Sequence, residues 1–65
     1  MNVSAELNFY GDTKEVRNKL FSFKVNNEND ARTGLKRFEK SGIRIRAAFF
    51  TIRKDGRIIN SLRIK

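Results

Sequence analysis

Arginine and lysine are the side chains in this sequence that could do chemistry, because the residues most used in catalysis and metal binding are missing. The chain holds 15 Lys or Arg and seven Asp or Glu, but no His and no Cys. Thiol catalysis, histidine acid–base chemistry, disulfides and zinc sites built on the usual ligands are therefore excluded. The carboxylates are scattered, and no glycine-rich phosphate loop occurs. We therefore expect a protein that is not an enzyme and that takes no metal and no cofactor.

The basic residues are concentrated in the second half of the chain. Residues 1–30 carry four Lys or Arg against five Asp or Glu, a net charge of −1, whereas residues 31–65 carry eleven against two, a net charge of +9. Such an asymmetry is the electrostatic footprint of a protein that binds a polyanion, most often nucleic acid. The alternative is a surface whose charge only confers solubility, since a net charge of this size is common in small domains.

Alternation of apolar and polar residues predicts a strand over residues 3–10, which the turn-forming residues 11–13 bring to an end. The high aromatic and β-branched content of residues 17–25 favours a second strand. A helix is the alternative there, because Asp12 and Glu15 have the spacing of a capping box.

The signals for a helix between Asn27 and Gly42 are stronger. Asn27 can cap the helix, and Glu28 and Asp30 place negative charge in its first turn. Gly42 is suited to the left-handed residue that follows a helix. The expected apolar stripe consists of Ala31, Leu35 and Phe38.

The last part of the chain predicts a β-hairpin, in which runs 43–53 and 57–64 flank the turn Asp55-Gly56. A two-residue turn pairs Lys54 with Arg57. The face expected to cover the helix consists of Ile43, Ile45, Ala47, Phe49 and Thr51, opposite Ile64, Leu62, Asn60 and Ile58. The other face consists of Arg44, Arg46, Ala48, Phe50 and Ile52, opposite Lys65, Arg63, Ser61 and Ile59. A register shifted by one residue is rejected because it would turn Arg44 and Arg46 toward the core.

Together these elements predict an α+β fold of the order ββαββ, in which an antiparallel sheet carries one helix on one face and leaves the other face open. Its length predicts a single domain over residues 1–65. No apolar run approaches the roughly 20 residues of a membrane span, and no secretory signal is visible. We therefore expect a soluble intracellular (cytoplasmic) protein with no membrane partner.

The charged face of the hairpin is the predicted binding site. Arginine forks suit phosphate oxygens, and an exposed Phe50 ring could stack on an unpaired base. The alternative is that Phe50, Ile52 and Ile59 pack into a second small core. The helix adds a second basic surface, whose alternative is an ordinary solvated helix face. The candidate residues are Arg44, Arg46, Phe50, Lys54, Arg57, Arg63 and Lys65 in the hairpin and Lys36, Arg37 and Lys40 in the helix.

Three hypotheses follow for the partner. The first is sequence-tolerant binding of nucleic acid, either DNA or RNA, through the basic face of the hairpin. The second is a phage or mobile-element accessory protein that inhibits a host nucleic-acid enzyme or defence complex, and whose partner is an acidic protein or a nucleoprotein. In its small size and its lack of His and Cys, the chain is similar to anti-CRISPR proteins, although no motif carries that comparison. The third is a homodimer, because edge strands and leftover apolar surface favour pairing in so small a domain.

Overall fold

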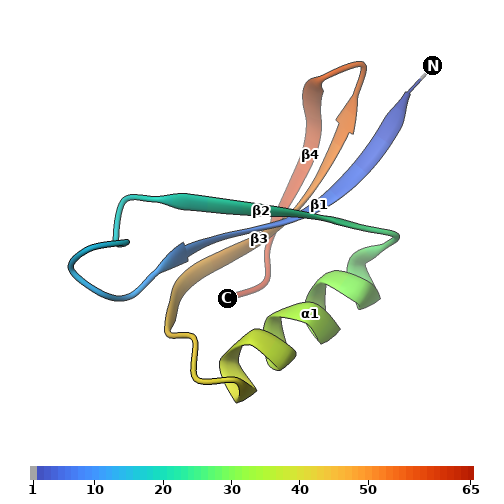
Figure 1. Cartoon of the computed structure of the whole chain (residues 1–65). Coiled ribbons are helices and arrows are strands. Elements are labelled where there is room, and N and C mark those ends of the chain that lie inside the picture. The colour runs from blue at the N-terminus through green and yellow to red at the C-terminus, as the bar shows by residue number, and fades with distance from the viewer. Residues whose placement is uncertain (1) are drawn as a thin grey trace.

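The computed structural model describes residues 2–65 and shows a four-stranded antiparallel sheet with one helix packed on one face (Figure 1). The elements are β1 (Val3–Gly11), β2 (Leu20–Val25), α1 (Glu28–Lys40), β3 (Ile45–Lys54) and β4 (Arg57–Arg63). The strands lie in the order β2-β1-β3-β4, so that β2 and β4 are the two edges of the sheet. The predicted α+β architecture is confirmed.

The segment between β1 and β2 forms turns rather than the alternative helix. The amide of Val16 donates to the carbonyl oxygen of Thr13, and the amide of Lys19 donates to that of Val16. β2 then begins at Leu20, within the predicted strand 17–25. The aromatic content of this segment thus outweighed its capping signal, because the aromatic side chains pack on the sheet.

Both predicted ends of α1 are confirmed. The side chain of Asn27 accepts a hydrogen bond of 2.8 Å from the amide of Asp30, and the Asp30 carboxylate in turn accepts from the amide of Asn26 at 3.3 Å. The first bond satisfies a backbone donor that the first turn of a helix leaves free, and the second ties the residue before the cap to that turn. Beyond the last turn, Gly42 has a φ of +95°, in the region that favours glycine.

The core lies between α1 and the sheet. Ala31 and Leu35 of the helix are buried there, as the apolar stripe predicts. The sheet contributes Leu7, Phe9, Ile45, Ala48 and Phe50, and the half-buried Ala5, Phe21, Val25, Phe38, Ile52 and Ile64 surround this cluster. Among residues 2–65, no helix is long and apolar enough to span a membrane.

The predicted faces of β3 are wrong from residue 47 onward. Ala48, Phe50 and Ile52 pack toward the helix, where Ala47, Phe49 and Thr51 were expected. The cause is a β-bulge in the pairing of β1 with β3. Tyr10 lies opposite Ala47 and Gly11 lies opposite Ile45, so Arg46 is an extra residue in β3. One inserted residue exchanges the faces of every residue beyond it.

A second bulge lies in the β3–β4 hairpin. The two-residue turn is confirmed, since Lys54 pairs with Arg57 and Arg53 pairs with Ile58. Asp55 and Gly56 have φ values of +52° and +84°, as the turn requires. Ile52 then pairs with Asn60, which leaves Ile59 as the extra residue.

The second bulge keeps most of β4 on its predicted faces. Leu62 lies opposite Phe50 and Asn60 opposite Ile52, both on the helix side as expected. Ile58 was expected there too, but it pairs with Arg53 and lines the opposite face. The register shifted by one residue was rejected because it would turn Arg44 and Arg46 toward the core. The two bulges avoid that cost in another way, since they turn Phe50 into the core and still keep Arg46 out of it.

Candidate nucleic-acid interface

The side of the sheet opposite α1, here called the open face, carries a shallow hollow of about 230 Å³. Side chains of all four strands line it: Asn8, Tyr10, Leu20, Phe49, Thr51, Arg53, Ile58 and Ser61. Because both aromatic and hydrogen-bonding groups are present, the hollow can contact a flat ring and also the polar edge of a ligand.

Two aromatic rings lie on the open face. Tyr10 of β1 pairs with Ala47, and Phe49 of β3 pairs with Asn8, so the two rings are diagonal neighbours on adjacent strands. Diagonal neighbours in a sheet lie about 7–8 Å apart, within reach of aromatic side chains. Both residues are half-buried. Each ring is therefore packed into the sheet and still partly accessible to a ligand.

An arginine accompanies each ring. The guanidinium carbon of Arg46 lies 5.0 Å from the centroid of the Tyr10 ring, and one of its terminal nitrogens donates to the carbonyl oxygen of Arg17 at 2.8 Å. Arg63 lies opposite Phe49 in the β3–β4 ladder, and its Nε donates to a main-chain oxygen of Lys65 at 2.8 Å. Main-chain oxygens thus hold both side chains in place.

These two arginines have no acidic side chain beside them. Within residues 2–65, no Asp or Glu carboxylate lies within ion-pair distance of Arg46 or Arg63. The Nε of Arg46 is also buried without a hydrogen-bond partner in the same part of the chain. A ligand with anionic oxygens could bond to the outer guanidinium nitrogens of these two arginines, whereas the buried Nε of Arg46 is out of its reach.

A polar network lies at the centre of the open face. Glu6 accepts hydrogen bonds from the Nε of Arg53 at 3.1 Å and from the side-chain amide of Asn8 at 3.2 Å. Asn8 also donates to the hydroxyl of Ser22 at 2.8 Å. Burial opposes ionisation of Glu6, but the hydrogen bonds from Arg53 and Asn8 and the charges of Arg53 and Lys24 outweigh it. The pKa of Glu6 therefore lies below its ordinary value of 4.5.

We expect this network to make the stability of the protein depend on pH. Because the pKa of Glu6 is lowered in the folded state, its contribution is complete above about pH 4.5 and is lost as the pH falls below that value. The variant Glu6→Gln should be less stable than the wild type by about 1 kcal/mol at pH 7. This difference should shrink toward zero at pH 3 in thermal unfolding followed by circular dichroism. A difference that stays constant from pH 7 to pH 3 would contradict the assignment.

The structure places the predicted binding residues in several different locations. Of these residues, Arg46 and Arg63 lie on the open face, Arg46 against β1 and Arg63 on β4. Phe50 is 8% exposed and belongs to the core, so the prediction that its ring is available for stacking is wrong. Phe50 fills the space between β3 and α1. The alternative that this residue packs into a core is therefore confirmed, although the core is the main one and not a second small one. Lys54 and Arg57 flank the hairpin turn at the far end of the sheet.

The remaining candidates lie on the helix side or have acidic neighbours. Arg44 approaches Asp12, with 3.9 Å between the charged atoms, and Lys65 forms an ion pair with Glu39 of the helix. Their charges are thus compensated in part. Three further basic residues are exposed on α1 and belong to the opposite layer from the open face: Lys36, Arg37 and Lys40.

Sequence reasoning missed Tyr10 and Phe49. Tyr10 could have been found, because it belongs to the polar phase of the alternation in β1, which places it on the side away from the helix. Phe49 had no such signal, because it was assigned to the helix side by the hairpin register. Only the bulge at Arg46 brings it to the open face.

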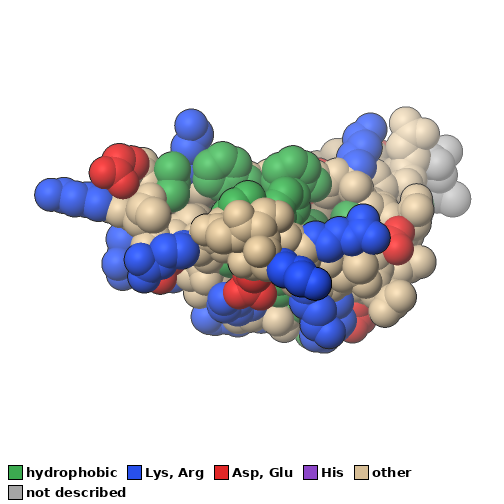
Figure 2. Space-filling model, turned by 60° about the horizontal axis from the view of Figure 1, so that its bottom comes forward, with side chains coloured by type: hydrophobic (Ala, Val, Ile, Leu, Met, Phe, Trp, Pro, Cys, Tyr) green, Lys and Arg blue, Asp and Glu red, His purple; other side chains and the backbone are tan. Residues whose placement is uncertain are grey.

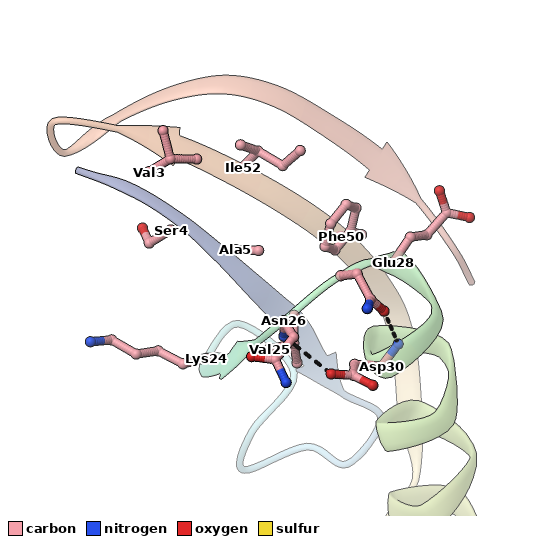
Figure 3. Close-up of a pocket in the computed structure, with 11 residues that line it drawn as sticks. Val3, Ser4, Ala5, Lys24, Val25, Asn26, Glu28, Asp30, Phe50 and Ile52 are labelled. Carbon is pink, nitrogen blue, oxygen red and sulfur yellow. Dashed lines mark hydrogen bonds between the residues drawn. The ribbon is translucent and has the colours of Figure 1, made fainter. Parts of the chain in front are cut away.

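A larger groove of about 820 Å³ lies on the helix side, where the sheet extends past the start of α1 (Figure 3). Its floor is apolar, and Val3, Ala5 and Ile52 of neighbouring strands contribute to it. On its rim, the Asp30 carboxylate accepts a hydrogen bond from the amide of Asn26. Glu28, also on the rim, pairs with Arg32 at 2.9 Å. These carboxylates are therefore engaged locally, and no group of acidic residues within residues 2–65 is placed to hold a metal ion.

The protein is thus a small α+β domain. A helix covers one side of its sheet, and aromatic and arginine side chains lie on the other side. Comparison with known proteins finds no matching family model, no matching curated protein and no matching solved structure.

Proposed function

We propose that this protein binds single-stranded nucleic acid on its open face. The observation that carries the proposal is the juxtaposition of Tyr10 and Phe49 with Arg46 and Arg63. Each ring has a neighbouring arginine that lacks an Asp or Glu partner within residues 2–65. Stacking of bases on aromatic rings together with basic groups along the backbone is the usual chemistry of single-strand recognition.

A single strand fits this face better than a duplex. The rings are half-buried in the sheet, so they can receive a base only if that base is unstacked and turned toward them. In a duplex the bases are stacked on one another and offer only their edges. The hollow next to the rings adds the exposed hydroxyl group of Ser61, which can bond to a base edge or to a sugar.

The test is the binding of labelled oligonucleotides as a function of salt. The open face carries the cations Lys24, Arg46 and Arg63. If they neutralise three phosphates of a single strand, the logarithm of the binding constant should fall with the logarithm of the salt concentration with a slope of about −2. We expect a 12-nucleotide single strand to bind more tightly than a duplex of the same length in fluorescence anisotropy between 50 and 300 mM NaCl. The double variant Arg46→Gln with Arg63→Gln should reduce the magnitude of the slope by about 1.4.

The matched control removes the same kind of charge from the other layer. Changing Lys36 and Lys40 of α1 to Gln should leave most of the affinity and the slope intact, because these residues lie on the helix side of the sheet. Equal losses in the two double variants would mean that binding depends only on net charge. A slope near zero for the wild type, or a preference for the duplex, would contradict the proposal.

A protein partner is the second candidate, and one observation favours it. Leu20 and Ile58 line the same hollow and are 48% and 57% exposed. Apolar anchors next to arginines are also typical of protein-binding hot spots. An inhibitor of a nucleic-acid enzyme would form a one-to-one complex with its target through this face. Such a complex would survive nuclease treatment and would be lost in Leu20→Ala together with Ile58→Ala.

A further inference from the structure

The edge strand β2 carries an aromatic cluster that is only partly covered. The ring of Phe9 lies 5.3 Å from that of Phe21 and 5.9 Å from that of Phe23, and the rings of Phe23 and Phe38 are 4.9 Å apart. Phe23 nevertheless remains 42% exposed. Figure 2 shows hydrophobic side chains gathered in a patch on the helix-bearing face, with Lys and Arg side chains around it.

Within residues 2–65, the same strand leaves one row of backbone groups without a partner strand, because β2 pairs with β1 on one side and with no strand on the other. Unpaired edges of this kind accept a further strand. Residues 20–25 contain a single charge, that of Lys24. Edge strands are normally protected by charges, bulges or proline, and β2 has little of this protection.

The other edge is better protected. β4 has Arg57 and Arg63 at its two ends, and the bulge at Ile59 interrupts its regular geometry. Although β4 is exposed throughout, a straight partner strand could pair with only part of it. Of the two edges, β2 is therefore the one suited to association.

We propose that two copies of this chain pair through antiparallel β2 strands and form one continuous eight-stranded sheet with both helices on the same side. Residues that face each other must then come from the same face of the sheet. A register centred on Ser22 meets this condition, since it places Phe21 opposite Phe23 of the second copy and Leu20 opposite Lys24 of the second copy. No two like charges then face each other in the paired strands.

The properties of this dimer follow from its size and charge. The interface comprises one short strand pair and the two aromatic patches, which places it among small interfaces of less than about 1,200 Å². We therefore expect a dissociation constant on the order of 10 to 100 µM. Because each copy has a net charge of +8, the two copies repel each other, and added salt should strengthen the dimer. Salt has the opposite effect on the binding of nucleic acid.

The experiment introduces a single cysteine at the centre of the proposed register. The chain has no cysteine, so the only protein–protein disulfide that Ser22→Cys can form joins two copies, by way of the mixed disulfide with glutathione. Directly opposite residues lie close enough to be bridged after small adjustments. The matched control is Ser61→Cys, an exposed serine on the other edge strand. Under glutathione oxidation at 100 µM protein, we expect the Ser22→Cys dimer to form at least about tenfold faster.

Sedimentation equilibrium of the wild type and of Phe23→Ser provides the second measurement. The wild type should show a monomer–dimer equilibrium that shifts toward the dimer at 0.5 M NaCl, and Phe23→Ser should raise the dissociation constant at least about tenfold while it keeps a wild-type circular dichroism spectrum. Equal cross-linking at the two positions would overturn the proposal. A wild type that is monomeric at 500 µM protein and 0.5 M NaCl would also overturn it. In that case the β2 edge would be available to a strand of a different protein.

The proposed dimer and the proposed binding of nucleic acid can be tested independently of each other. Phe23 lies on the helix side of the sheet, so Phe23→Ser should keep its affinity for oligonucleotides at concentrations where the wild type is monomeric. Conversely, removing the rings of Tyr10 and Phe49 from the open face should leave the dimer unchanged, because neither residue lies in β2.

Discussion

Replacing Phe50 by alanine is expected to leave the protein mostly unfolded at 25 °C. Phe50 is buried between β3 and α1, in the cluster that contains Leu7, Ala31 and Leu35. Loss of a buried phenylalanine costs about 3–5 kcal/mol, because both its contacts and the space it filled are lost. A core of this size rarely stabilises a domain by more than about 3–5 kcal/mol. Urea and thermal unfolding followed by circular dichroism would measure the loss.

The neighbouring ring provides the control. Phe49→Ala removes the same number of atoms one position away, but from the open face, and should lower the free energy of unfolding by only about 1 kcal/mol. Phe50→Leu should recover a large part of the lost stability, because it refills much of the cavity. If Phe49→Ala unfolded the protein and Phe50→Ala did not, the faces of β3 and the bulge at Arg46 would be wrong.

The second large effect is expected when both open-face rings are removed. Stacking of a base on an aromatic side chain contributes about 1–3 kcal/mol. If Tyr10 and Phe49 each receive one base, the double variant Tyr10→Ala with Phe49→Ala should lose at least about 30-fold in affinity for a single-stranded oligonucleotide. The salt dependence of binding should remain, because the cations of the open face are still present. Fluorescence anisotropy at 100 mM NaCl measures the loss.

Exchanging the two rings is the appropriate control for that experiment. Tyr10→Phe with Phe49→Tyr keeps two aromatic faces at the same positions and moves one hydroxyl group between them, so it should bind within about threefold of the wild type. Full affinity in the double alanine variant would show that the bases do not stack on this face. A loss in the exchanged variant as large as in the alanine variant would show that the hydroxyl group of Tyr10 is essential.

The charge asymmetry of the sequence indicated a basic surface, but the structure divides that surface. Arg46 and Arg63 reach the open face, whereas Arg44 and Lys65 lie beside Asp12 and Glu39. These acidic partners are distant in the sequence, and they become neighbours only when the turn after β1 and the helix lie close to the ends of β3 and β4. A count of charges along the chain contains no information about such pairs.

The order of the elements, the limits of α1 and the turn between β3 and β4 could be predicted from local signals in the sequence. These features depend on local chemistry: the cap at Asn27, the left-handed conformation of Gly42 and the positive φ of Asp55 and Gly56. Which side of β3 faces the helix depends instead on packing between distant segments. Ala47 to Phe50 are all apolar, so the pattern fits either face, and no local signal distinguishes Phe49 from Phe50. The orientation of β3 depends on its pairing with β1 and β4. Bulges at Arg46 and Ile59 in these pairings allow Phe50 to be buried while the guanidinium group of Arg46 stays outside the core.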